Sequence, residues 1–284
     1  MSARAGDLDR PGYGAWRRRF ARGLIISVAV SFVALLLVVP LVTVFIEAFS
    51  HGVGNYFRTF SAGDTRAAVR LTLMTAAVVV PLNTLFGIAA AYAIARFRFY
   101  GKNVLTTLID LPYAISPVIS GLIFVMLFGA QGWFGPWLQE HQVSVIFAWP
   151  GILVATMFVT CPYVARELIP LMQLLGTDDE EAAISLGAGG WTTFFRVTLP
   201  KIQWGVVYGV ILCNARAMGE FGAVAVVSGH IRGLTTTMPL QVEILYNEYN
   251  GAAAFAVASL LSLLAVVTLA VRTVIEWRAE ASRG

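Results

Sequence analysis

Charge is scarce in this sequence. Asp, Glu, Lys and Arg together make up 13% of the 284 residues, whereas hydrophobic residues make up 58%. Soluble globular domains carry about 25% charged residues, so the composition excludes an ordinary soluble domain. The net charge of +4 is not gathered into a basic patch interleaved with aromatic residues, and nucleic acid is therefore not an expected partner.

Cysteine and histidine are also scarce. The two cysteines, Cys161 and Cys213, fall in different apolar segments, and we interpret them as buried apolar side chains rather than as a disulfide or a metal site. None of the three histidines has a second ligand at a metal-binding spacing. We therefore expect no metal and no cofactor bound by this chain.

Catalytic motifs are missing as well. The sequence contains no G-x-x-x-x-G-K-[ST] phosphate loop and no G-x-S-x-G nucleophile motif. We therefore expect no catalytic residue, and a membrane enzyme is an unsupported interpretation. Any source of energy for the protein must lie in another chain.

Long apolar segments, in contrast, are abundant. A helix needs roughly 20 apolar residues to cross a bilayer. Lipid offers the backbone no hydrogen bonds, so each such segment must be a helix, and these are too long for barrel strands. The expected fold class is all-α, a polytopic membrane protein with about six transmembrane helices, at residues 24–46, 71–95, 104–128, 145–165, 202–227 and 252–271.

Positive charge is distributed unevenly around these segments. Fifteen of the twenty Lys and Arg residues lie before the first segment, after the last, or in the second and fourth connections, and only four lie in the alternate loops. Because cytoplasmic loops carry an excess of Lys and Arg, we expect both termini in the cytoplasm, with tails at residues 1–23 and 276–284.

One polar segment interrupts the apolar pattern, in the longest inward loop at about residues 166–201. Four acidic residues, 178–181, begin a short helical pattern, with Thr177 as its N-cap and the acids placed near the positive end of the helix dipole. Three glycines between residues 187 and 190 permit a sharp reversal. A second amphipathic helix should follow, with Pro200 at the start of the next span.

This helix–turn–helix also carries a longer pattern. Glu-Ala-Ala, three residues, Gly, nine residues and then Val-x-Leu-Pro resembles the EAA loop of ABC importer permeases, and every fixed position is matched. The alternative is an amphipathic loop that rests on the bilayer. The resemblance implies a coupling helix whose glutamate makes polar docking contacts, and the implied docking residues are Glu181, Ala182, Ala183, Gly187, Leu199 and Pro200.

The same resemblance implies partners and a mechanism. Residues 66–275 would form the type 1 transmembrane domain of a permease subunit, which pairs with a homologous permease and docks on a dimer of cytoplasmic ATPases. Closure of the ATPases on ATP would push the loop and rock the spans between inward-open and outward-open states. ATP would thus be used by the partner ATPase and not by this chain.

Three further stretches resemble the sulfate/thiosulfate permeases, within a group that includes molybdate and tungstate permeases. They are "LIDLPYAISPVISGL", "FVTCPYVARELIP" and "NARAMGEFGAVAVVSGHIRG". The serine-glycine continuation of the last stretch, with "PLQVEILYNEYN" and "TDDEEAAISLGA", resembles the W-type subunit more than its T-type partner. This resemblance implies a cell inner membrane location and three contacts: a T-type permease, a separate extracytoplasmic sulfate-binding protein and membrane lipid. Molybdate or tungstate transport, and a self-contained anion channel or secondary carrier, remain alternatives.

Polar residues inside two spans are the candidates for the transport route. Arg216 and Glu220 share one face of a helix, with Asn214 nearby. They form either an ion pair that fixes the helix bundle or a route in which Arg216 offers positive potential to a passing dianion. In span 104–128, Asp110 and two prolines predict a gating kink or a static bend, and Asp110 would repel an anion unless a cation neutralises it.

The last outward loop, residues 228–250, contains Thr235, Thr236 and Thr237. We interpret it as a contact surface for the binding protein or as a plain solvated connection.

Overall fold

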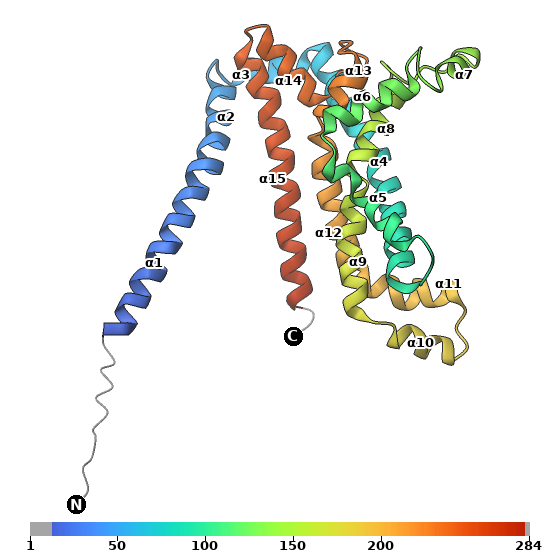
Figure 1. Ribbon diagram of the computed structural model, residues 1–284. Coiled ribbons are helices and arrows are strands. Elements are labelled where there is room, and N and C mark those ends of the chain that lie inside the picture. Colours follow the sequence, from blue (N-terminus) through green and yellow to red (C-terminus); the bar gives the residue numbers. More distant parts are fainter. Residues whose placement is uncertain (1–12, 282–284) are drawn as a thin grey trace, which may run out of the picture.

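Helices make up the described part of the chain. The computed structural model describes residues 13–281, and within this range the chain forms α-helices, two π-helical segments, turns and bends, without a strand (Figure 1). The predicted all-α fold class is confirmed. Residues 1–12 and 282–284, which form the outer parts of the two expected tails, lie outside the described residues.

The spans are of two kinds. Among the described residues, four helical segments are long and apolar enough to cross a membrane: Phe20–Phe49, Gly63–Arg96, Trp149–Leu175 and Gly251–Val271. Two bent pairs of helices reach this length only if each pair is counted as one span, which brings the number to six. The six expected segments therefore correspond to four continuous crossings and two broken ones.

The first crossing stands apart from the others. It is one long helix built from α1 (Tyr13–Val33), the π-helical η1 (Ala34–Val38) and α2 (Val39–Phe49). α2 packs against α15 (Gly251–Ala281), whereas α1 leads away from α15 (Figure 1). None of the most apolar part of this crossing is buried within the chain. Its surface is therefore available to lipid or to another subunit.

The centre of the molecule is a tight three-helix packing. It is formed by α4 (Gly63–Arg96), α9 (Pro162–Leu175) and α12 (Leu199–Met218). Val164 of α9 lies between two glycines: a Cβ added to Gly87 would lie 2.6 Å from Val164 Cβ, and one added to Gly209 would lie 3.1 Å from Val164 Cα. Small residues let membrane helices approach closely, so these two glycines set the spacing of the bundle.

A polar link supports the junction of α8 and α9 beside this packing. The span that ends in α9 begins with α8 (Trp149–Thr160), and α9 starts at Pro162, which has no N–H to donate. Asn83 of α4 donates one hydrogen bond to the Met157 carbonyl at 3.0 Å and one to Thr160 Oγ1 at 2.8 Å. Buried polar groups in lipid need such partners, which explains why the second span contains an asparagine.

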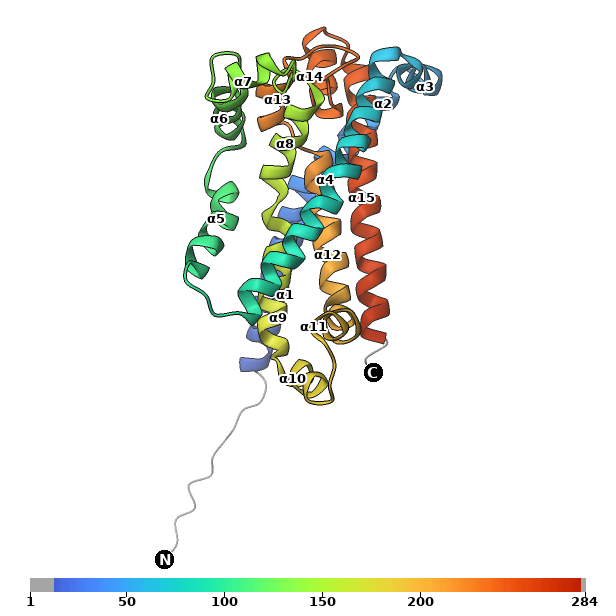
Figure 2. The same ribbon diagram turned by 90° about the vertical axis from the view of Figure 1, so that its right-hand side faces the viewer.

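The spans predicted at 104–128 and 202–227 are both broken by a bend. α5 (Lys102–Ala114) and α6 (Pro117–Phe128) meet at 110°, because Ile115 and Ser116 are extended ahead of Pro117 (Figure 2). α12 and α13 (Gly222–Ser228) meet at 49°. α13 packs against both α6 and α8, so the two broken spans meet each other.

The expected inward loop at 166–201 is shorter than predicted. α9 continues to Leu175, α10 occupies Asp178–Ser185, and the helix that begins at Gly190 runs without a break to Met218. Pro200 is the second residue of α12, as predicted, but α11 (Gly190–Thr193) and η2 (Phe194–Thr198) lead into α12 without a break. η2 is a π-helical turn, and such turns are where helices bend.

The remaining helices lie at the two ends of the bundle. α3 (Val53–Ser61), α7 (Gly135–Glu140) and α14 (Met238–Asn247) lie at one end. α10 (Asp178–Ser185) and α11 (Gly190–Thr193) lie at the other, which we call the α10 end (Figures 1 and 2). α1 begins and α15 finishes toward the α10 end, so the outer ends of the first and last spans lie on the same side and the two spans run in opposite directions.

Candidate coupling site

The coupling site begins with a short acidic helix. Asp178–Ser185 carries four acidic residues in its first turn, where carboxylates interact favourably with the helix dipole. Thr177 occupies the N-cap position, but its side chain makes no capping bond to the backbone. Its hydroxyl instead donates to Glu181 Oε1 at 2.6 Å. Thr177 therefore orients the exposed carboxylate of Glu181.

The helix ends in a glycine-dependent turn. Gly187 has φ +91°, its N–H donates to the Ile184 carbonyl at 2.9 Å, and the Ala188 N–H donates to the Ala183 carbonyl at 3.0 Å. This is the Schellman arrangement, which needs a left-handed residue after the helix. Gly189 has an ordinary φ of −72°. The reversal predicted for the glycine cluster therefore depends on Gly187.

An apolar tip rimmed by acids projects from this turn. Ile184 and Leu186 are 58% and 90% exposed, and Ala182 and Glu181 are exposed beside them. α10 is the outermost helix at the α10 end (Figure 1). Large apolar side chains exposed in such a position are typical of a surface that another protein covers.

The Leu-Pro end of the EAA pattern lies outside this hairpin. Leu199 is half-buried and packs against the central core, and Pro200 is exposed on the continuous helix. The structure thus brings together Glu181, the two alanines and Gly187 in one hairpin, and it places the Leu-Pro pair in the helix that carries the hairpin.

Glu180 is a buried, ion-paired residue of the hairpin that the sequence analysis missed. We interpreted the four acids together, as charges near the positive end of the helix dipole, but Glu180 is buried and forms an ion pair with Arg96, whose Nε lies 2.9 Å from Glu180 Oε2. Its neighbour Asp179 makes an exposed ion pair with Lys201. The one available signal was helical spacing, because Glu180 lies one turn before the half-buried Ala183.

The second group of candidates lies at the break between α12 and α13. Arg216 Nη1 lies 2.5 Å from Glu220 Oε2, and only 1% of the Glu220 side chain is exposed. Glu220 Oε1 also accepts the Ala223 N–H at 2.9 Å, at the start of α13. The ion pair and the 49° bend are therefore parts of one local structure.

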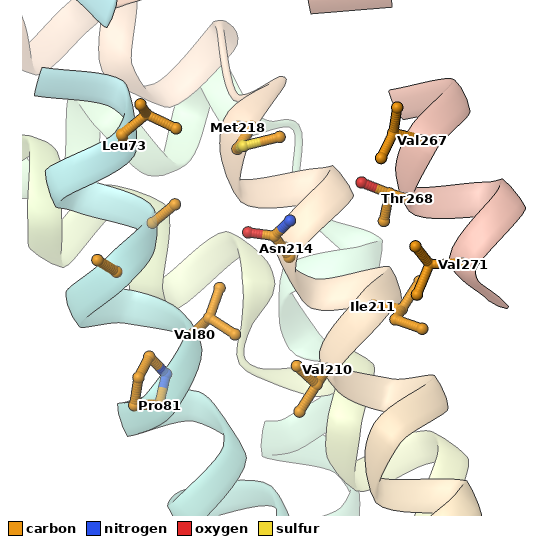
Figure 3. Close-up of a pocket in the computed structure, with 12 residues that line it drawn as sticks. Leu73, Val80, Pro81, Val210, Ile211, Asn214, Met218, Val267, Thr268 and Val271 are labelled. Atoms are coloured by element: carbon orange, nitrogen blue, oxygen red, sulfur yellow. The ribbon is translucent and has the colours of Figure 1, made fainter. Parts of the chain in front are cut away.

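Asn214 lines a groove that the ion pair does not reach. The groove has a volume of about 500 Å³ and lies between α4, α12 and α15 (Figure 3). Its wall is apolar except for Asn214 and Thr268. Within the described part of the chain, no group of three or more His, Cys, Asp or Glu side chains could hold a metal ion.

A family model decides what kind of protein carries this site. The model of the binding-protein-dependent transport system inner membrane component matches residues 83–280, which include the hairpin, the central helices and the 216–220 ion pair. The chain belongs to this family of ABC importer permeases. The permease character predicted from the EAA pattern is confirmed.

Individual relatives of the permease agree with this assignment. The sulfate transport system permease protein CysW of Escherichia coli strain K12 is 45% identical over 94% of this chain and 92% of its own length. CysW of Synechococcus elongatus is 49% identical over 89% of each chain. CysT of E. coli K12 is 34% identical over 89% of this chain and 92% of its own length, so the predicted likeness to the W-type subunit is confirmed.

A solved structure has the same fold as the permease. It is a bacterial alginate ABC transporter in complex with an alginate pentasaccharide-bound periplasmic protein. The TM-score is 0.75 over 93% of this chain and 95% of that chain. The sequence identity is 15%, so this likeness concerns the fold alone.

The permease neutralises Asp110 with Arg166. Arg166 Nε lies 2.8 Å from Asp110 Oδ1, and the guanidinium lies 5.0 Å from the centre of the Tyr113 ring. The cation that Asp110 needs if it is not to repel an anion is therefore supplied by α9. The 110° break beyond Asp110 lies in the span where Asp110 and the prolines predicted a gating kink or a static bend.

The three threonines of the last loop cannot form the contact surface that we considered. Thr235, Thr236 and Thr237 are all buried in the permease. Thr235 Oγ1 donates to the Ser228 carbonyl at 2.6 Å and Thr236 Oγ1 donates to the Ile231 carbonyl at 3.1 Å, so two of these side chains satisfy backbone groups of a buried connection. The exposed parts of the loop are residues 229–234 and 246–250. Glu248 forms an ion pair with Arg232, and its hydrogen bond raises the pKa of the Arg232 guanidinium.

Proposed function

We propose that this chain is the transmembrane subunit of an ATP-driven importer that carries sulfate or thiosulfate into the cytoplasm by alternating access. The anion assignment rests on the relatives, which are sulfate permeases at 45% and 49% identity over most of the chain. The observation that carries the coupling role is the α10 hairpin, which holds Glu181 and Gly187 at the outermost point of the bundle.

The α10 end is the cytoplasmic end in this proposal. Arg96 and Lys201 lie at this end, and the first and last spans have their outer ends there. An excess of Lys and Arg on the cytoplasmic side then orients both termini toward the cytoplasm of a cell inner membrane. The opposite end, with α7 and the exposed residues 229–234, faces the binding protein.

Docking uses the apolar tip and its acidic rim. Leu186 and Ile184 enter a groove of the ATPase, and Glu181, oriented by Thr177, makes the polar contact at the edge. Buried apolar anchors with a polar rim are the usual structure of a stable interface. When ATP closes the ATPase dimer, α10 moves, and the bundle follows because α10 is joined to it on both sides.

The partner permease completes the route. The groove beside Asn214 lies between α4, α12 and α15, and none of the most apolar part of the first crossing is buried within the chain, so both surfaces are available to a second subunit. The homologous T-type permease is the partner that the CysW and CysT relatives suggest. The route needs to bind the anion only weakly, because tight binding within it would slow transport. The separate binding protein captures the anion.

Reconstitution tests the proposal. The chain, a T-type permease, the ATPase and the binding protein are purified and placed in liposomes, and radioactive sulfate uptake is measured with and without ATP. We expect ATP-dependent uptake only with all partners, with thiosulfate, molybdate and tungstate compared as competitors. Sulfate flux from this chain alone would contradict the proposal and favour a channel or a secondary carrier.

A further inference from the structure

The carboxylate of Glu180 is the most enclosed charge at the α10 end. Its side chain is 11% exposed and that of its partner Arg96 is 7% exposed. The adjacent pair, Asp179 with Lys201, has side chains that are 60% and 40% exposed. Two neighbouring acids of one short helix thus form ion pairs of opposite character, one buried and one in solvent.

Glu180 joins α10 to three transmembrane helices. Arg96, the last residue of α4, bonds the carboxylate and also donates from Nη1 to the Met172 carbonyl of α9 at 2.8 Å. Thr198, at the end of η2 where α12 begins, donates to Glu180 Oε1 at 2.8 Å. The three helices that meet at this carboxylate are α4, α9 and α12, which form the central packing of the bundle. We call Glu180, Arg96 and Thr198 the clasp.

The rest of α10 is attached weakly. The helix packs mainly on η2 and α11, and it is bounded by Gly176 and Gly187, which both have positive φ. Glycines in this conformation place little steric restriction on the direction of the helix. Charge-assisted hydrogen bonds are directional and about twice as strong as neutral ones, and breaking a buried pair leaves an uncompensated charge. The clasp therefore selects one orientation of α10.

We propose that Glu180 is the positioning residue that makes α10 move as one body with α4, α9 and α12. The inference rests on the proposed function, in which α10 docks on the ATPase. Glu180 touches neither the ATPase nor the anion; the docking face is formed by Glu181, Ile184 and Leu186. Without the clasp, α10 still docks but turns about its two flanking glycines, and ATP is hydrolysed with little movement of the bundle.

The test is the number of sulfate ions imported per ATP hydrolysed by the complete reconstituted complex. For Glu180→Gln we expect this ratio to fall by about tenfold, the factor expected for loss of one charge-assisted hydrogen bond. Association with the ATPase, measured by co-purification, should stay at the wild-type level. Asp179→Asn is the matched control, because it removes the neighbouring exposed pair, and its ratio should equal that of the wild type.

A second variant keeps the test decisive if Glu180→Gln does not fold. Thr198→Val has nearly the same shape and removes one donor while the Arg96 ion pair stays, so the ratio should fall less but in the same direction. Thr198→Ser keeps the donor and should restore the wild-type ratio. A purely structural role would lower thermal stability without changing the ratio.

Three results would contradict the proposed role of the clasp. One is a wild-type ratio in both Glu180→Gln and Thr198→Val, and another is an equal loss in Asp179→Asn. The third is loss of ATPase association in Glu180→Gln, which would assign Glu180 to the docking face. Failure of the proposed function gives a different result, because the wild-type complex itself would then not assemble or import sulfate.

Discussion

Replacing Gly187 with alanine tests the hairpin at its most demanding position. Gly187 has φ +91°, and a Cβ added there meets no atom within 4 Å, so the substitution acts through backbone strain and not through a clash. A left-handed conformation costs a residue with a side chain about 1–2 kcal/mol. That strain corresponds to about a 5- to 30-fold change in a local equilibrium.

Almost all of this strain should destabilise the folded conformation of α10. α10 has eight residues, and a helix of this length has little stability of its own. The Schellman turn closes it through bonds from the Gly187 and Ala188 N–H groups, so strain at Gly187 lowers the population of the docking conformation. We expect the dissociation constant for the ATPase, measured with the permease pair in nanodiscs, to rise by about 5- to 30-fold.

Gly189→Ala is the matched control. Gly189 also has open space around its Cα, but its φ is −72°, which any residue adopts. Alanine there should leave affinity unchanged and raise stability by up to about 1 kcal/mol, because the unfolded chain loses freedom. If Gly187→Ala binds the ATPase and transports like the wild type while both variants insert normally, the hairpin seen in the structure is not the docked form.

Two further substitutions test the bundle and the broken span. Gly87→Ala should lower the melting temperature of the purified permease, because its Cβ would meet Val164 Cβ at 2.6 Å. Such overpacking costs about 1–3 kcal/mol. The control is Gly63→Ala, which lies in open space at the start of the same helix and should leave the melting temperature unchanged. Arg216→Gln should reduce sulfate flux and leave ATPase affinity unchanged, because it leaves the buried Glu220 without its cation and lies far along α12 from the hairpin. A wild-type melting temperature for Gly87→Ala would contradict the close packing, and normal flux in Arg216→Gln would remove that residue from the transport mechanism.

Local sequence signals predicted most of the elements. Apolar length identified every span, and the acids, alanines and glycine of the EAA pattern placed the hairpin correctly, because these signals act within a few residues. The bounds were less accurate. Pro200 suggested a helix start, yet the π-helical turn before it lets the helix continue. Pro117 suggested a kink, but the size of the 110° angle depends on the packing of α6 against α13.

The clasp shows the limit of sequence reasoning most clearly. Glu180 and Arg96 are 84 residues apart, and Thr198 is 18 residues from Glu180. No periodicity connects such positions, so the acid looked like the three around it. The contact surface considered for the threonines at 235–237 failed for the same reason. Polar residues in a loop are expected to be exposed, but the tertiary structure buries these three.

The amino-acid sequence by itself determined that the protein is a helical membrane permease and where its hairpin lies, because hydropathy, charge bias and turn chemistry are properties of short stretches of chain. Only the tertiary structure decided which acid of the hairpin faces inward, which spans break, and which polar side chains are buried. These features depend on partners brought together from distant helices, and a buried charge is stable only where such partners surround it.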